Sequence, residues 1–372
     1  MPRSVTLLAL LALTSLACAD PAGPDRAATA TASSLGHDSH GAGRITVMSR
    51  NLYVGADVDR VIGALATPDP ADDIPALLAA VAVVQETDFA TRAKAIAGEI
   101  ARNRPDVVGL QEVSKLDLDL TRLGGTTVIH LDFLAILQDA LAARGLSYRV
   151  AATVQNTQAS PVQGISLTDF DAVLVGPGVE VGPNPIARNY TANIGTVAPG
   201  ITIIRGFIQI DATISGRHYI VANTHLESGR GTGLPQLRAA QALELVSAIG
   251  TTLPAILLGD FNDVAGSPMH QVILGAGFSD VWAGLRRRSP GFSCCQVEDL
   301  SNPRSELNQR IDFVFARGTG TLRDPVKGEV HLTGARAHDK VPGPVHPLWP
   351  SDHAGLVATL ITPPAWGLVA GL

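Results

Sequence analysis

The sequence predicts an α/β fold in which β-sheets are covered by helices. Short apolar runs that end in polar residues recur along the chain, as strands do. Longer stretches with apolar residues at three- and four-residue spacings are interspersed with these runs, which favours covered sheets over a bare β-sandwich. The chain has 372 residues, 46% of them hydrophobic, and shows no repeat of fixed period. This composition supports one large core and disfavours a solenoid or a propeller.

The predicted elements follow from these patterns. The first strand is expected at residues 45–48, just before the polar sequence Ser49-Arg50-Asn51. Residues 74–102 have helical spacing with a break near residues 85–88, and a second helix is expected at residues 236–249. The further strands are expected at residues 107–110, 171–175, 201–214, 219–223, 255–258, 311–316 and 355–361.

The N-terminal segment, residues 1–18, has the pattern of an export signal. Arg3 precedes an apolar run at residues 5–16, which is too short to cross a bilayer because a spanning helix needs about 20 residues. The residues up to Cys18 resemble the cleavage box of bacterial lipoproteins, in which Cys18 becomes the lipidated N-terminus. Cleavage after Ala19 is the alternative. We favour a membrane-anchored lipoprotein, with a soluble periplasmic or secreted protein as the second interpretation.

The rest of the chain divides by composition. Residues 19–43 are rich in Ala, Ser, Thr, Gly and Pro and lack an apolar period, so they are expected to form a flexible linker. Residues 44–362 are expected to form one domain, and residues 363–372 a short apolar tail. We expect the protein to act as a monomer.

Charge and cysteine content limit the possible functions. The formal net charge of −6 argues against a protein that binds duplex backbone through a broad basic face. Apart from Cys18, the cysteines are the neighbours Cys294 and Cys295, and no spacing in the sequence is typical of a zinc site. The neighbouring pair could form a disulfide or remain two thiols.

Polar, ionisable residues recur where apolar strands stop. Such residues can converge on one rim of a sheet, which is where α/β proteins bind ligands. Taken singly, each has a structural explanation, such as a turn, a surface carboxylate or a hydrogen-bonded core histidine. The residues at these strand ends are Asn51, Glu112, Asn223, His225, Asp260, Asn262, Asp352 and His353.

Asp312 is harder to explain structurally. It lies between Ile311 and Phe313 in an apolar strand, where an unpartnered carboxylate would be costly. An imidazole is a natural partner, because the carboxylate would orient the ring and raise its basicity.

Together these segments resemble, in order, the motifs of the endonuclease/exonuclease/phosphatase superfamily. The superfamily includes secreted deoxyribonucleases, apurinic-site endonucleases, bacterial sphingomyelinases and inositol polyphosphate phosphatases. The resemblance extends over residues 44–362 and implies a four-layer α-β-β-α sandwich of two packed mixed β-sheets covered by helices. The matching segments are Ser49-Arg50-Asn51-Leu52, Leu110-Gln111-Glu112-Val113, Asn223-Thr224-His225-Leu226, Gly259-Asp260-Phe261-Asn262-Asp263, Arg310-Ile311-Asp312-Phe313 and Ser351-Asp352-His353.

The resemblance implies a metal site and a phosphate site. Glu112 would be the principal metal carboxylate, with help from Asn51 and Asp352. Asp260 and Asn262 would face the scissile phosphate, and Asp260 would orient or deprotonate the attacking water. Few carboxylates at a phosphate site suit magnesium, with manganese as the alternative, better than a calcium cage.

The resemblance also implies roles for the histidines. His353, paired with Asp312, would be a second base or a phosphate-binding imidazole. His225 would hydrogen-bond the phosphoryl oxygens, and Asn223 would support the phosphate side. In secreted deoxyribonucleases a carboxylate backs the first histidine. Asp171 occupies that place here, and Asp169 competes with it.

The predicted function is therefore an exported, metal-dependent phosphoester hydrolase, most simply a phosphodiesterase. The alternatives are an extracellular nuclease, a phosphodiesterase of phospholipid head groups, and a catalytically silent binding module, which the complete motif set disfavours. The substrate could be a nucleic acid, a phospholipid head group or a small phosphodiester. Residues 54–89 resemble an insertion of open role, residues 117–132 are another variable stretch, and the loop 293–296 is expected to border the pocket.

Overall fold

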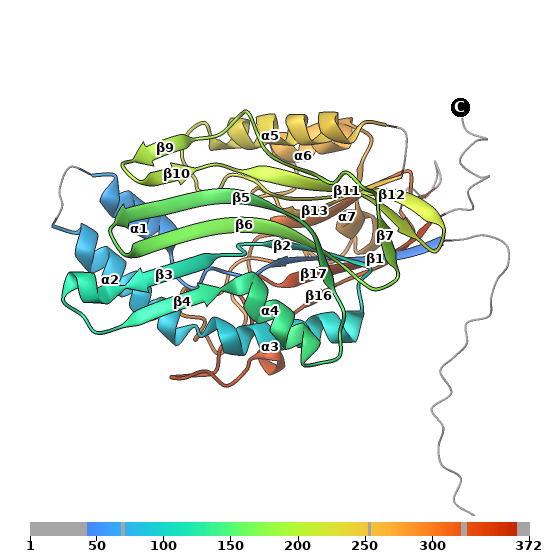
Figure 1. Cartoon of the computed structure of the whole chain (residues 1–372). Coiled ribbons are helices and arrows are strands. Elements are labelled where there is room, and N and C mark those ends of the chain that lie inside the picture. Colours follow the sequence, from blue (N-terminus) through green and yellow to red (C-terminus); the bar gives the residue numbers. More distant parts are fainter. Residues whose placement is uncertain (1–42, 68–70, 252–253, 321–325, 363–372) are drawn as a thin grey trace, which may run out of the picture. The chain divides into compact units, whose positions relative to one another are not determined.

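Two mixed β-sheets form the centre of the molecule (Figure 1). The computed structural model describes residues 43–67, 71–251, 254–320 and 326–362. The predicted signal segment and C-terminal tail lie outside the described residues, and so does the predicted linker except for Gly43, which belongs to the first strand. Parallel pairing occurs between the first two strands of one sheet and between two central strands of the other, and the remaining pairs are antiparallel.

The first sheet, sheet A, has ten strands. In spatial order its main path is β16 (Gly328–Thr333), β17 (Gly355–Thr362), β1 (Gly43–Asn51), β2 (Val107–Gln111), β6 (Ile165–Val175), β5 (Arg149–Val162), β10 (Ile201–Ile203) and β9 (Gly195–Ala198). The hairpin of β3 (Lys115–Asp119) and β4 (Val128–Asp132) joins the path at β6. This hairpin accounts for the variable stretch 117–132.

The second sheet, sheet B, has seven strands. Their order is β14 (Ser279–Asp280), β15 (Asp312–Arg317), β13 (Ala255–Asp260), β12 (Arg217–His225), β11 (Gly206–Ile214) and β7 (Val179–Val181), with β8 (Ile186–Asn189) also paired to β11.

Helices cover the outer face of each sheet (Figure 1). Sheet A is covered by α2 (Asp73–Glu86), α3 (Phe89–Asn103) and α4 (Phe133–Ala142), and sheet B by α5 (Leu234–Ile249) and α6 (Pro268–Gly275). The short helices are α1 (Val58–Leu65) and α7 (Val281–Leu285), and single 3₁₀ turns span Leu120–Leu123 and Ala337–Asp339. The predicted four-layer sandwich is confirmed.

The alternation of side chains along the strands builds three apolar layers. In β1, Ile45 and Val47 point into the core between the sheets, whereas Met48 points to the core beneath α3. In β13, Ile256 and Leu258 join the middle core and Leu257 joins the outer core beneath α5 and α6. Because each central strand is buried on both faces, its sequence is a continuous apolar run.

Most predicted elements are present, with one correction. The helical stretch breaks at Thr87 and Asp88, between α2 and α3, as predicted. The predicted strand 201–214 is two strands, because the chain leaves sheet A after β10 and enters sheet B with β11. Apolar character continues through the crossing, so the pattern did not indicate the change of sheet.

No single helix in the described part of the chain is long and apolar enough to span a membrane. α2 and α3 reach that length only as a pair, which is bent by 49°. Both helices pack apolar side chains on sheet A.

The topology brings the polar strand ends together. β1 and β2 are parallel, and so are β12 and β13, so these strands end at the same rim. β15 runs antiparallel to β13, which places Asp312 opposite Asp260 in the register. His353 lies just before β17, the antiparallel neighbour of β1.

Candidate active site

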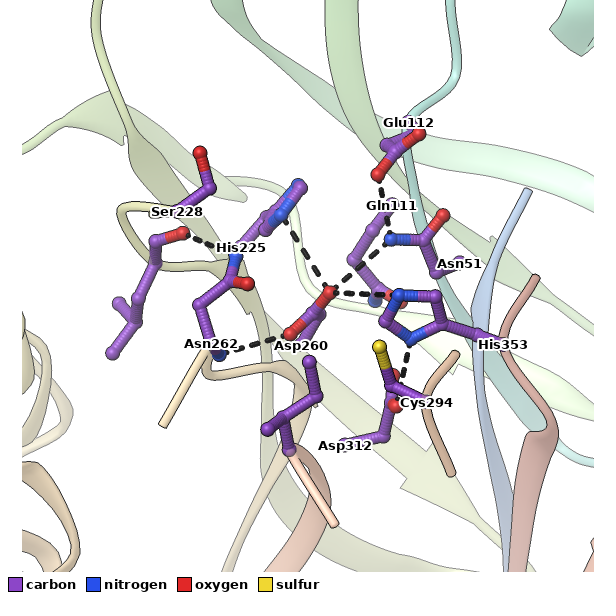
Figure 2. A network of polar contacts seen from close by, with 12 residues as sticks. Asn51, Gln111, Glu112, His225, Ser228, Asp260, Asn262, Cys294, Asp312 and His353 are labelled. Carbon is purple, nitrogen blue, oxygen red and sulfur yellow. Dashed lines mark hydrogen bonds and ion pairs between the residues drawn. The ribbon is translucent and has the colours of Figure 1, made fainter. Parts of the chain in front are cut away.

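A cleft of about 650 Å³ lies at this rim. Six of the predicted site residues line it: Glu112, His225, Asp260, Asn262, Asp352 and His353. The other four, Asn51, Asp171, Asn223 and Asp312, are buried behind this lining. Figure 2 shows several of these side chains converging on Asp260. The predicted set therefore separates into residues that face a ligand and residues that hold them.

His353 is paired with Asp312, as predicted (Figure 2). Its Nδ1 atom lies 2.9 Å from Oδ2 of Asp312, which is buried. Since an ionised carboxylate only accepts hydrogen bonds, Nδ1 carries the proton. Burial lowers the pKa of His353, but the carboxylates of Asp312, Asp352 and Asp260 outweigh burial and hold the pKa well above its usual value. These carboxylates therefore favour the protonated, imidazolium form of His353.

Buried polar groups fix the main chain of His353. The Ser351 hydroxyl accepts the His353 N–H at 3.1 Å, and the guanidinium of Arg50 donates to the His353 carbonyl. Arg50 also pairs with Glu99 of α3 at 3.1 Å, and neither side chain is exposed. The arginine of the first motif is thus a link between helix α3 and the catalytic rim.

The loop 293–296 forms hydrogen bonds to the main chain at both Asp312 and the residue after His353. The Ser293 hydroxyl accepts the main-chain N–H of Asp312 at 3.2 Å, and the Ser293 carbonyl accepts the N–H of Ala354 at 2.8 Å. The sulfur atoms of Cys294 and Cys295 adjoin in this loop. Cys295 Sγ lies 3.9 Å from His353 Nε2, and the loop lines the cleft as expected.

Asp260 lies between the two imidazoles. Its Oδ2 atom is 3.7 Å from Nε2 of His225 and 3.7 Å from Nε2 of His353. The same oxygen accepts the Asn51 amide at 3.2 Å, while Oδ1 accepts the Asn262 N–H at 2.9 Å. Burial and the nearby charge of Asp312 raise the pKa of Asp260 to about 7. A carboxylate with this pKa is suited to take a proton from water near neutral pH.

His225 has a different partner from the one predicted. Its Nδ1 atom lies 4.0 Å from Asp171, which is beyond hydrogen-bonding distance, and 3.2 Å from Nη1 of Arg205. A guanidinium only donates, so Nδ1 of His225 accepts and the proton is on Nε2. Burial and the charge of Arg205, followed by that of His353, hold the pKa of His225 well below its usual value. Asp171 thus lies behind His225 at ion-pair distance but without the expected hydrogen bond, and the contact with Arg205 favours a neutral ring.

The competing acid, Asp169, does not back His225 by a hydrogen bond either. Its carboxylate accepts the Ser114 hydroxyl at 2.8 Å. Burial and the charge of Glu112 raise its pKa to about 7. Both Asp169 and Asp171 are buried near the charge of Arg205. Burial also raises the pKa of Asp171 well above its usual value, so both acids favour the protonated form.

Arg205 is the main functional residue that the sequence analysis missed. It lies where the chain crosses from β10 to β11, and it is buried while lining the cleft. Its Nε lies 3.4 Å from Glu227 and its Nη2 3.3 Å from the Ser228 hydroxyl, so the guanidinium has a fixed orientation. An arginine inside the apolar run 201–214 is as unusual as Asp312 in its strand. The same burial argument would have found it.

Glu112 is held rigidly at the other wall of the cleft. Its two oxygens accept the Asn51 amide at 2.9 Å and the Val54 N–H at 2.8 Å. Burial and repulsion from Asp352 raise the pKa of Glu112. Asn51 itself uses its amide oxygen to accept the Tyr53 N–H at 2.8 Å. Its NH₂ group faces the carboxylates of Glu112 and Asp260, so Asn51 positions both beside the predicted metal site.

Asn223 also has a different role from the predicted one. Its side chain is fully buried and donates to the carbonyls of Leu110 and Ala172, at 3.0 and 3.3 Å, in sheet A. Its oxygen accepts the Gln111 amide at 2.6 Å. Asn223 therefore ties strand β12 of sheet B to sheet A beneath the cleft and does not face a phosphate.

The cleft residues fit a hard divalent cation. Among the described residues, no Lys or Arg nitrogen lies within 4.0 Å of the carboxylates of Glu112 and Asp352, although both line the cleft. Uncompensated oxygen ligands of this kind suit magnesium or manganese. The ligand atoms of Asp260, Asp312 and His353 also lie within 4.8 Å of one another. The His353–Asp312 hydrogen bond favours acid–base work for that group.

The fold and this cleft define a class of protein: a hydrolase of phosphoesters that depends on a divalent metal. The model of the Endonuclease/Exonuclease/phosphatase family matches residues 57–353. The chain belongs to this family, whose members hydrolyse phosphoester bonds. No curated protein sequence matches the chain significantly.

Solved structures agree on the fold. An endonuclease/exonuclease/phosphatase from Beutenbergia cavernae DSM 12333 has a TM-score of 0.56 at 20% identity, covering 86% of this chain and 72% of that one. A family protein from Bacteroides thetaiotaomicron has a TM-score of 0.54 at 17% identity, covering 87% and 97%. TDP2 from C. elegans has a TM-score of 0.50 at 19% identity, covering 86% and 75%. At these identities the similarity shows the fold alone.

Proposed function

We propose that this protein is an exported phosphodiesterase in which water attacks phosphorus at the rim beside Asp260, with Mg²⁺ or Mn²⁺ held by Glu112 and Asp352. The observation that carries the proposal is the position of Asp260. Its carboxylate lies 3.7 Å from an Nε2 atom of each of two imidazoles that differ in charge. A base flanked by two N–H donors can activate a water molecule while the donors stabilise the charge on the phosphoryl oxygens.

Each side chain has a separate task in this mechanism. Asp260 accepts the proton of the attacking water at Oδ2. His353 donates its Nε2–H to a phosphoryl oxygen, and its positive charge offsets the negative charge that the oxygens gain. His225 donates a neutral Nε2–H from the opposite side. When bound, the divalent cation supplies further positive charge for the phosphoryl and leaving oxygens.

The charge of the cleft favours a small diester over a polyanion. Arg205 and Arg230 are the only Lys or Arg side chains in the described lining. Acidic residues outnumber them: Asp57, Asp59, Glu112, Asp169, Asp260, Glu298 and Asp352. A phosphodiester carries one negative charge, whereas a monoester carries up to two and a nucleic acid carries one per nucleotide. We therefore favour a small or head-group phosphodiester over a nucleic acid.

Metal dependence tests this proposal first. Hydrolysis of bis(p-nitrophenyl) phosphate by the purified protein should stop in excess chelator and return with Mg²⁺ or Mn²⁺. Glu112→Gln should raise the metal concentration needed for half-maximal activity while the protein still unfolds cooperatively. Asp117→Asn, an exposed carboxylate on β3, is the matched control and should change neither. Full activity in chelator would overturn the proposal.

Export through a lipidated Cys18 is part of the same proposal. It rests on Arg3 and on the apolar run at residues 5–16 that ends close to Cys18. Expressed in a bacterium that processes lipoproteins, the wild-type protein should fractionate with membranes and Cys18→Ser should be soluble. A wild-type protein that is soluble and begins at Asp20 would instead support ordinary secretion.

A further inference from the structure

Helix α1, in the segment that resembles an insertion, is packed unusually loosely. It is amphipathic, yet none of its residues is buried. Its apolar side chains Val58, Val61, Ile62 and Leu65 face a pocket. Asp57 caps the helix by accepting the Arg60 N–H at 3.1 Å, so α1 is formed even though its apolar face is incompletely covered.

The pocket beside α1 is apolar and enclosed by sheet A and α2. Its volume is about 70 Å³. Apart from Ser166, every lining side chain is apolar, and the lining comes from α1, α2, β3, β5, β6 and β10. Figure 1 shows α1 and α2 beyond the ends of these strands. An apolar cavity of this kind stays dry and binds apolar groups.

The pocket borders the catalytic cleft. Both are lined by Val54, Ala56, Val58, Ile62 and Leu167. Val54 connects them most directly, because its main-chain N–H donates to the Glu112 carboxylate at 2.8 Å while its side chain lines the pocket. A group bound in the pocket would therefore lie next to the metal side of the cleft.

We propose that this pocket binds an alkyl or acyl group of the substrate, so that the substrate is a phosphodiester with an apolar chain on one side of phosphorus. This inference rests on the proposed function and adds the substrate class. We take the occupant to be the substrate's own chain because five residues line both the pocket and the cleft in which the phosphate would bind. The role of the insertion is then to supply the wall of this subsite.

The proposed subsite predicts how KM depends on the length of the apolar chain. Burying one methylene group contributes about 0.8 kcal/mol, which is about a fourfold change in an equilibrium constant. In a series of p-nitrophenyl alkyl phosphates with methyl, propyl, hexyl and decyl groups, KM should fall about fourfold per added carbon. The fall should level off once the pocket is filled.

Two variants test the location of the subsite, with the full chain and Mg²⁺ present. Leu65 and Ala80 line the apolar pocket but not the catalytic cleft. Leu65→Asp should remove the dependence of KM on chain length while turnover of the methyl ester stays unchanged. Ala80→Phe should shorten the chain at which KM levels off. Leu243→Asp, at an exposed site on α5, is the matched control.

The outcomes separate the two proposals. If no ester in the series is hydrolysed with Mg²⁺ present, the proposed function fails. If the methyl ester is hydrolysed but KM does not depend on chain length, the subsite is wrong. A chain-length dependence that survives both Leu65→Asp and Ala80→Phe would place the chain elsewhere, which also overturns the inference. If Leu65→Asp unfolds, Ala80→Phe decides the matter.

Discussion

The two walls of the cleft each carry a buried histidine, but the two histidines differ in charge. His353 is backed by the carboxylate of Asp312 and is positively charged, whereas His225 is backed by the guanidinium of Arg205 and is neutral. Both are buried and both lie 3.7 Å from Asp260. The rings differ because burial and the charge of Arg205 lower the pKa of His225, whereas the carboxylates of Asp312, Asp352 and Asp260 raise the pKa of His353.

The comparison also explains why two histidines are useful at one carboxylate. Two imidazolium groups so close to Asp260 would repel each other and lower the pKa of the carboxylate, which would weaken it as a base. One charged ring stabilises the developing negative charge, and one neutral ring donates a hydrogen bond without adding charge. The cleft thereby keeps Asp260 with a pKa of about 7.

Removal of the His353–Asp312 pair should have the largest effect on kcat. His353→Ala should lower kcat by at least about a hundredfold, because a positioned acid–base group contributes roughly a hundred- to ten-thousand-fold. Asp312→Asn should lose a comparable amount, since it removes the carboxylate charge that orients the ring and keeps it protonated. The double variant should be little slower than His353→Ala, because the two residues act as a unit. Strictly multiplicative losses, measured by steady-state kinetics, would contradict the pairing.

Replacement of Arg205, the residue behind His225, should have a smaller effect on kcat, and this effect should depend on pH. Arg205→Met removes a hydrogen bond to the ring of His225, which costs about tenfold in kcat. The charge of Arg205 lowers the pKa of His225, so its loss raises that pKa and lets the ring become protonated as the pH falls. The deficit relative to the wild type should therefore grow toward acidic pH and shrink toward alkaline pH.

The control for this prediction is Arg205→Lys. It keeps the positive charge and should retain a low pKa for His225, while the single donor orients the ring less well. Its deficit should be constant across the pH range. A pH-dependent deficit in Arg205→Lys that equals that of Arg205→Met would mean that Arg205 has only a structural role.

Much of the fold could be predicted from the sequence because buried strands and helices have strong periodicities. β1 and β13 bury both faces, and the break at Thr87 interrupts the helical spacing. The strand predicted at 201–214 was wrong, because a continuous apolar run does not reveal that the chain passes from one sheet to the other at Arg205. Sheet membership depends on long-range pairing that local spacing does not contain.

The sequence predicted which residues lie at the site, but it did not predict how their side chains are oriented. Asp312 was paired correctly because a carboxylate in an apolar strand needs a partner. Asn51 was expected to help hold the metal and Asn223 to support the phosphate side, but the sequence did not indicate which neighbouring groups bind their amides. The orientation of each amide depends on hydrogen bonds to neighbouring groups. A sequence motif does not specify these hydrogen bonds.

The most direct test of the account is the charge state of the two rings. Nitrogen-15 NMR of the histidine side chains at neutral pH should show His353 with protons on both nitrogens and His225 with a proton on Nε2 alone. His353→Gln and His225→Gln assign the signals. We predict that lowering the pH by one unit leaves both states unchanged, because the pKa of His353 is raised and that of His225 is lowered. A neutral His353 or a doubly protonated His225 at neutral pH would contradict the account.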